Sequence, residues 1–167
     1  MSTLWESTRD LHHACEGHSV GEAMASGKPP INWYAQWVKA LHQIHTVIDP
    51  HLPEAVHRSD RIQQDLDALN EANCEPLLSA QTYADSLTND NAIAGAAYVL
   101  TGAHLMGGEV MRRRLDGYPT NHLLWDDRKQ ALAVLKSYRN QGHLTTQARD
   151  CFYALLCIMD EIERVNS

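Results

Sequence analysis

The stretch AYVLTGAHLMGGEVMRRRL, residues 97–115, has apolar residues at helical spacing and yet contains two adjacent glycines, Gly107 and Gly108. A glycine inside a helix costs about 1 kcal/mol relative to alanine, so two together call for a reason. Glycines remove side chains and permit a kink. We therefore expect a kinked helix whose bare backbone leaves room for something flat or bulky. The same inward stripe carries Ile93, Ala97, Leu100, His104, Met111 and Leu115.

A period of about 3.6 residues extends over the rest of the chain, and no segment alternates in the manner of a β-strand. With 167 residues, the chain is long enough for one domain with a sizeable core. We therefore predict an all-α multi-helix bundle in which residues 1–167 form a single domain. The expected helices cover residues 4–25, 32–49, 60–70, 76–87, 90–115, 125–141 and 145–165, and Ser59 is the expected N-cap of the third.

Composition narrows the function classes. The net charge of −7 argues against nucleic acid as a partner. The start of the chain lacks a basic and apolar leader, and no run of residues predicts a membrane span, so we expect a cytoplasmic protein. The four cysteines, Cys15, Cys74, Cys151 and Cys157, form no CxxC pair and are expected to be reduced and buried. Ten histidines raise the chance of a metal or cofactor.

Polar residues interrupt two of the apolar stripes. His18 and Glu22 continue the apolar face of the first expected helix, and His104 lies on that of the long one. A histidine that faces a bare glycine surface suggests a plate-like ligand held between two helices. Haem is the commonest such plate, and histidine is a usual axial ligand of its iron.

The sequence resembles the haem oxygenase family over most of its length. In that family the first helix carries a histidine that ligates haem iron, followed four residues later by a glutamate. The stretch LHHACEGHSVGEA supplies His18 and Glu22 at this spacing. The distal helix of the family has a tyrosine and then a Gly-Gly pair over the haem, which Tyr98, Gly107 and Gly108 match.

Two further parts of the chain carry the resemblance. The family has an exposed Tyr-Arg that contacts a haem propionate, and SYRNQ supplies Tyr138 and Arg139. Lys136 is a second candidate for a propionate. Phe152 falls where the family has an aromatic residue in the pocket wall. These positions are expected to bind the cofactor, although a solvated helix face is the alternative for the two basic residues.

One departure concerns the distal helix. Three residues before the Gly-Gly pair, the biliverdin-forming enzymes have an aspartate that holds a water network. Here that position is His104, and Ala103 replaces the preceding glycine. A histidine can order water and deliver protons near neutral pH, or it can ligate the iron and close the oxygen site.

The resemblance implies an enzyme that binds haem as cofactor and substrate and opens it to biliverdin, iron and carbon monoxide. His18 would hold the iron, Glu22 would orient His18, and His104, Gly107 and Gly108 would form the catalytic side. Oxygen is the oxidant, and a ferredoxin or flavoprotein reductase is the implied electron donor. The basic run 112–114 is either a docking patch for that donor or solvated surface.

Three other interpretations remain open from the sequence. A non-catalytic haem sensor or carrier would have the same fold, with His18 and His104 both on the iron. A thiaminase-like hydrolase or a di-iron oxidase would also be helical, but a di-iron site needs more inward carboxylates than Glu22 alone. His42 and His45 could bind zinc, although no further ligands are apparent.

Overall fold

The computed structural model describes residues 3–70 and 75–167, and these ranges contain helices and no strand. The all-α prediction is therefore confirmed. The described residues also form four short 3-10 helices: η1 (Asp49–His51), η2 (Glu54–Val56), η3 (Asn121–Leu123) and η4 (Gly142–Leu144). The α-helices are α1 (Leu4–Gly17), α2 (Ser19–Ala25), α3 (Ile31–Ile48), α4 (Ser59–Ala68), α5 (Leu78–Ser86), α6 (Asp90–Met106), α7 (Gly108–Arg114), α8 (Arg128–Tyr138) and α9 (Thr145–Val165).

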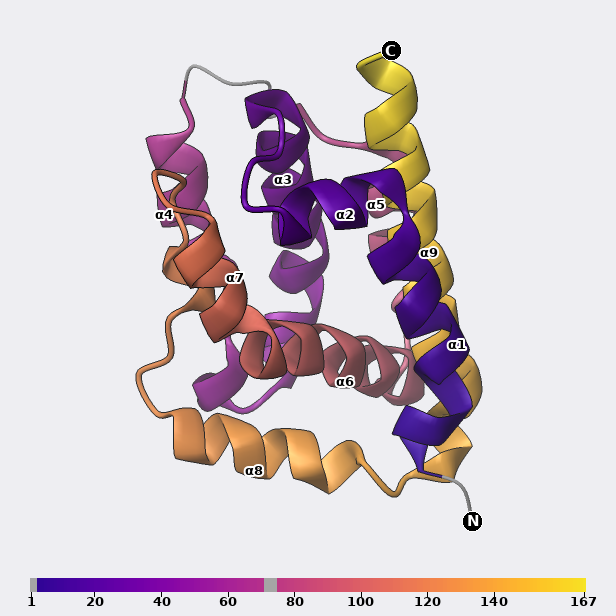
Figure 1. Cartoon of the computed structure of the whole chain (residues 1–167). Helices are drawn as coiled ribbons and strands as arrows, with labels where there is room; N and C mark the ends of the chain where they lie inside the picture. The colour runs from indigo at the N-terminus through magenta and orange to yellow at the C-terminus, as the bar shows by residue number, and fades with distance from the viewer. Residues whose placement is uncertain (1–2, 71–74) are drawn as a thin grey trace.

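In Figure 1, α6 crosses the lower half of the molecule above α8, and it packs mainly against α9 and α8. The long α9 runs beside α1 and also contacts α6, while α3 packs against α4 and α5. The core between them consists of fully buried aliphatic side chains, including Leu41, Ile44 and Ile48 on α3, Leu100 on α6, and Ile158 and Ile162 on α9. Burying each such side chain contributes roughly 1.5–3 kcal/mol.

The first expected helix is broken at His18, so the prediction of one continuous helix over residues 4–25 is wrong. His18 has an extended backbone, with φ −69° and ψ 146°, which ends α1 and begins α2. Its ring accepts a hydrogen bond from the Val20 N–H at 3.1 Å, as an N-cap side chain does. Gly17, the last residue of α1, is a poor helix former and favours the break at this point.

The second break lies at the glycine pair, where a kink is expected. α6 ends at Met106 and α7 begins at Gly108, so the predicted helix over 90–115 is two helices joined at Gly107. The Gly107 N–H still bonds the carbonyl of Ala103 at 3.3 Å. The chain thus turns without losing the last hydrogen bond of α6.

Two helix starts differ from expectation because other side chains cap them. Ser59 lies inside α4 and does not cap it. The carboxylate of Asp49 accepts the backbone N–H groups of Arg58 and Ser59 at 2.8 and 2.7 Å. The helix expected at residue 125 begins instead at Arg128, because the Asp127 side chain accepts the N–H of Gln130.

The cysteines and the apolar segments give two further results. Cys15 and Cys151 are free and buried, but Cys157 is exposed on α9, so the prediction that all are buried is wrong for it. Cys74 lies outside the described residues. In the parts of the chain that the structure describes, no helix combines the length and apolar character needed to cross a bilayer.

Candidate functional site

A cavity of about 650 Å³ lies between α1 and α6 and extends to α3, α8 and α9. This volume is within the range of roughly 300–1,000 Å³ typical of sites for small molecules and cofactors. Its lining is mostly apolar; Leu41, Leu100, Leu155 and Met159 are among the buried residues that form it. Polar groups interrupt this surface, among them a histidine–glutamate pair, two buried histidines and two basic side chains.

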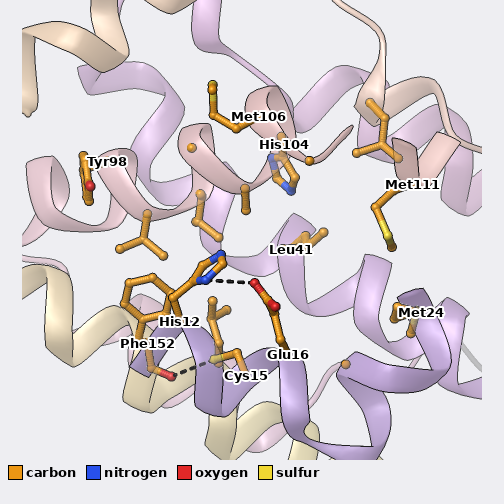
Figure 2. Close-up of a pocket in the computed structure, with 18 of the residues that line it drawn as sticks. His12, Cys15, Glu16, Met24, Leu41, Tyr98, His104, Met106, Met111 and Phe152 are labelled. Atoms are coloured by element: carbon orange, nitrogen blue, oxygen red, sulfur yellow. Dashed lines mark hydrogen bonds and ion pairs between the residues drawn. The ribbon is translucent and has the colours of Figure 1, made fainter. Parts of the chain in front are cut away.

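The histidine–glutamate pair is His12 and Glu16, one turn apart on α1. The His12 Nδ1 lies 2.9 Å from the Glu16 Oε1, at ion-pair distance but off the line of an ideal hydrogen bond. Figure 2 shows the His12 ring pointing from α1 toward α6, with Phe152 beside it. No group in the described part of the chain hydrogen-bonds the second ring nitrogen, Nε2. This arrangement leaves one nitrogen available to a ligand and the other next to a carboxylate.

The predicted pair, His18 and Glu22, does not line the cavity. The Nε2 atom of His18 lies 2.7 Å from the Asp160 Oδ1, and its Nδ1 caps α2. Glu22 is exposed. Because α1 ends at Gly17 and His18 has an extended backbone, His18 does not continue the helix face on which His12 lies. The structure thus brings the other His-x-x-x-Glu pair of the same stretch to the cavity.

The α6 side of the cavity carries His104, as the sequence analysis expects, and its side chain is buried with 6% of its surface exposed. Figure 2 shows its ring projecting from α6 toward the side of the cavity from which His12 projects. Burial, together with the neighbouring His45, His122 and Arg58, lowers the pKa of His104 well below its usual value. This histidine is therefore neutral at physiological pH.

The two glycines have different surroundings. Gly107 lines the cavity, and a Cβ placed on it would have only the Ala103 carbonyl oxygen within 4 Å, at 3.4 Å. Gly108 does not line the cavity, and a Cβ there would contact Leu123 at 3.5 Å. Bare backbone at Gly107 therefore widens the cavity, whereas Gly108 faces a neighbouring side chain.

The structure brings most of the other predicted residues to the same cavity. Tyr98, Lys136, Arg139 and Phe152 all line it, and the two basic side chains among them are exposed. Burial raises the pKa of the Tyr98 hydroxyl, which keeps it protonated. Tyr138 does not line the cavity; it packs against a smaller apolar cluster.

The remaining candidates lie elsewhere. In the run 112–114, Arg112 and Arg113 pair with Glu109, and Arg114 bonds the carbonyl of Ala25. His45 is buried and binds Asp49 rather than sharing a site with His42. Among the described residues no group of histidine, cysteine and carboxylate side chains is placed to hold a metal ion by itself, so the zinc alternative has no support.

Comparison with solved structures identifies the fold. The haem oxygenase of Leptospira interrogans superposes with a TM-score of 0.80 and 16% identity, over 95% of this chain and 97% of that one. The chain has the haem oxygenase fold. Haem oxygenase-1 of Synechocystis, solved with haem, gives 0.83 at 17% identity over 97% of this chain and 91% of its own. Haem oxygenase-2 of the same organism, solved with haem and NO, gives 0.81 at 17% over 97% and 84%.

Comparison by sequence gives no match for this chain. No protein-family model matches it, and no curated protein does. The fold is therefore shared while most side chains differ, and the roles of individual residues have to be argued from this structure.

Sequence reasoning missed His12, Glu16 and the histidines beside His104. The first two were detectable, because LHHACEGHSVGEA contains the His-x-x-x-Glu spacing twice. Only the copy at 12 and 16 follows the α1 stripe that includes Thr8 and Cys15 and faces the cavity. His45 and His122 gave no such signal, because they come from separate segments that meet only in the folded chain.

Proposed function

We propose that the chain binds haem in the cavity between α1 and α6 and opens it oxidatively, as a haem oxygenase. The observation that carries this proposal is the pairing of His12 with Glu16 on the cavity face of α1, in a fold shared with haem oxygenases solved with haem. A carboxylate next to one ring nitrogen orients a histidine ligand and raises its basicity. Histidine with a free second nitrogen in an apolar cavity is a usual axial ligand of haem.

The residues present fit this group. Haem needs an apolar space for its ring and cations for its carboxylates. The cavity supplies the first, and Lys136 and Arg139 are exposed cations within its lining. Arginine pairs with carboxylates through two parallel hydrogen bonds, and lysine acts as a point charge. His12 takes the ligand role that the sequence analysis gave to His18.

The opposite side of the cavity would handle oxygen and protons. Bound haem supplies both the iron at which oxygen is reduced and the ring that is opened. Gly107 leaves open space beside α6, and His104 presents a neutral imidazole there. A neutral imidazole can hold a water molecule and move a proton through it. Biliverdin, iron and carbon monoxide are the proposed products, and an external donor such as a ferredoxin or flavoprotein reductase supplies the electrons.

The test adds haemin to the purified protein and follows the Soret band, first without and then with ascorbate or a reductase in air. Formation of a stoichiometric complex followed by loss of the Soret band and release of a bilin is the expected result. Absence of a complex would overturn haem binding itself. The same assay with catalase present excludes ring destruction by free hydrogen peroxide.

A haem sensor or carrier is the second candidate, and one observation favours it. His104 projects from α6 toward the side of the cavity that holds His12, and its lowered pKa keeps a nitrogen lone pair available for ligation. A low-spin spectrum that persists on reduction, with no bilin formed, would select this function. A high-spin ferric spectrum followed by bilin formation would select the oxygenase.

A further inference from the structure

Three buried histidines lie side by side at the α6 wall of the cavity, and two of them, His104 and His122, line it. The ring of His104 has His45 of α3 on one side and His122 of η3 on the other, with centroids 5.5 and 5.7 Å away. His45 and His122 are only 1% and 4% exposed. The group lies among residues of three different elements, so its arrangement is a product of the fold.

Both outer histidines are held by buried carboxylates. The His45 Nδ1 lies 2.9 Å from the Asp49 Oδ1, and the His122 Nδ1 lies 2.6 Å from the Asp65 Oδ2. An ionised carboxylate can only accept hydrogen bonds, so each of these Nδ1 atoms carries the proton. When His45 is neutral, its Nε2 is therefore an unprotonated acceptor.

Two ring nitrogens in this group lack partners. The His45 Nε2 and the His104 Nδ1 are both buried and have no hydrogen bond to any described residue. Unpaired buried polar atoms destabilise a protein, and such groups are usually satisfied directly or through an ordered water. Because the His45 Nε2 is an acceptor, the His104 Nδ1 can donate a hydrogen bond to it only if the Nδ1 carries a proton. The neighbouring rings are close enough for a small rotation or one bridging water to join the two atoms.

We propose that Asp49 and His45 fix the tautomer of His104, so that its Nδ1 carries the proton and its Nε2 faces the cavity as an unprotonated acceptor. Asp49 and His45 act as positioning residues, since neither lines the cavity. The charged and titratable groups around His104 are Asp49, Asp65, Arg58, His45 and His122. Burial, the two histidines and the guanidinium of Arg58 disfavour a cationic His104, so its hydrogen bonding decides between two neutral tautomers.

The proposed tautomer has a consequence for the cavity, and this step alone rests on the proposed function. An unprotonated Nε2 holds a water molecule by accepting its hydrogen, which leaves the water oxygen free to face the bound group. A proton taken up by Nε2 can be balanced by moving the Nδ1 proton toward His45. This proton transfer would not require His104 to be charged before the proton arrives.

Asp49 offers a variant that should invert the tautomer. Its Oδ1 faces His45, while its Oδ2 accepts the N–H groups of Arg58 and Ser59. In Asp49→Asn these two donors hold the amide oxygen in the Oδ2 position, so the NH₂ group faces the His45 Nδ1. His45 then has to carry its proton on Nε2, and His104 has to accept at Nδ1 and carry its proton on Nε2.

The measurement is a long-range ¹H–¹⁵N correlation spectrum of ¹⁵N-histidine-labelled protein without haem, which distinguishes protonated from unprotonated ring nitrogens. We expect the Nδ1–H form for His104 in the unmodified chain and the Nε2–H form in Asp49→Asn. His122→Gln is the matched control, because it changes the other neighbour of His104 and should leave the tautomer unchanged.

The outcomes separate this proposal from haem binding. An Nε2–H form of His104 in the unmodified chain, or an Asp49→Asn protein in which His45 changes and His104 does not, would overturn it. If Asp49→Asn does not fold, His45→Phe decides. Loss of the pure Nδ1–H form supports the proposal, and its persistence refutes it. All spectra are recorded without haem, so a failed haem titration has no influence on them.

Discussion

On the α1 wall of the cavity, His12 is partly exposed and lies beside a carboxylate of its own helix; on the α6 wall, His104 is buried and faces two other histidines. A neighbouring carboxylate orients the ring and makes its other nitrogen a better donor to a metal cation, which suits a histidine that ligates iron. Burial beside two histidines and Arg58 disfavours charge and suits a histidine that exchanges hydrogen bonds with water. The groups around each ring thus suit His12 and His104 to two different roles.

The largest expected effect comes from removing the α1 histidine. His12→Ala should weaken haem binding more than about 100-fold and change the ferric spectrum, since losing only the partner of a metal ligand typically costs 10–100-fold. Haemin titration followed by absorption measures both. His18→Ala is the matched control, because it removes the histidine of the second His-x-x-x-Glu pair, which binds Asp160 outside the cavity. Equal losses in the two variants would contradict the assignment of His12.

The next effect concerns the carboxylate that distinguishes the two walls. Glu16→Gln should leave haem bound but weaken it by about 10–100-fold and lower the frequency of the iron–histidine stretch, because the ring loses its charged neighbour. Resonance Raman spectroscopy of the ferrous complex reports that frequency. Glu22→Gln, on the exposed side of α2, should change neither quantity. An unshifted iron–histidine stretch in Glu16→Gln would mean that Glu16 does not influence His12 as an iron ligand.

The two walls were also unequally accessible to prediction from sequence. The helices could be predicted because apolar periodicity reports burial directly. On α6 that pattern placed His104 on the face that lines the cavity, whereas Tyr98, which also lines it, was predicted from the family resemblance. On α1 the choice was between two His-x-x-x-Glu pairs, at 12 and 16 and at 18 and 22. It depended on whether the helix continues past Gly17, and the helix ends there. The break depends on cap geometry, which periodicity does not report.

The group behind His104 lies beyond sequence reasoning for a different reason. His45, Asp49, Asp65 and His122 share no motif and come from segments between α3 and η3. The contacts among the three histidines arise only when α3 and η3 pack near α6, and the His122–Asp65 contact arises when η3 packs against α4. A sequence shows which residues are polar in an apolar stripe, but not which distant residue satisfies them.

A moderate effect is expected at Gly107. Gly107→Leu should reduce haem affinity roughly tenfold or more, because overpacking a filled site typically costs about 1–3 kcal/mol. The apoprotein should be no less stable to urea, since a Cβ at this position meets no side chain. Gly108→Ala is the control: its Cβ reaches Leu123 at an ordinary 3.5 Å and should leave haem affinity unchanged. If Gly107→Leu bound haem normally, the α6 wall would lie farther from the ligand than we propose.

The smallest effect is a pH dependence of the apoprotein that arises on the α6 wall alone. The pKa of His104 is lowered well below 6.5 in the folded chain by burial, whereas the unfolded chain has the ordinary value. Above pH 6.5 both states are neutral and the group adds no slope. As the pH falls below 6.5 the unfolded state takes up the proton first, so the free energy of unfolding decreases by up to about 1.4 kcal/mol per pH unit. Urea unfolding at pH 7.5, 6.5 and 5.5 measures this loss.

In His104→Gln the loss between pH 6.5 and 5.5 should be smaller by about 1 kcal/mol. His143→Gln, which replaces an exposed histidine, should keep the full loss. Identical pH profiles for all three proteins would show that His104 takes up a proton as readily when folded as when unfolded, and the contrast between the two walls would then rest on hydrogen bonding instead of charge.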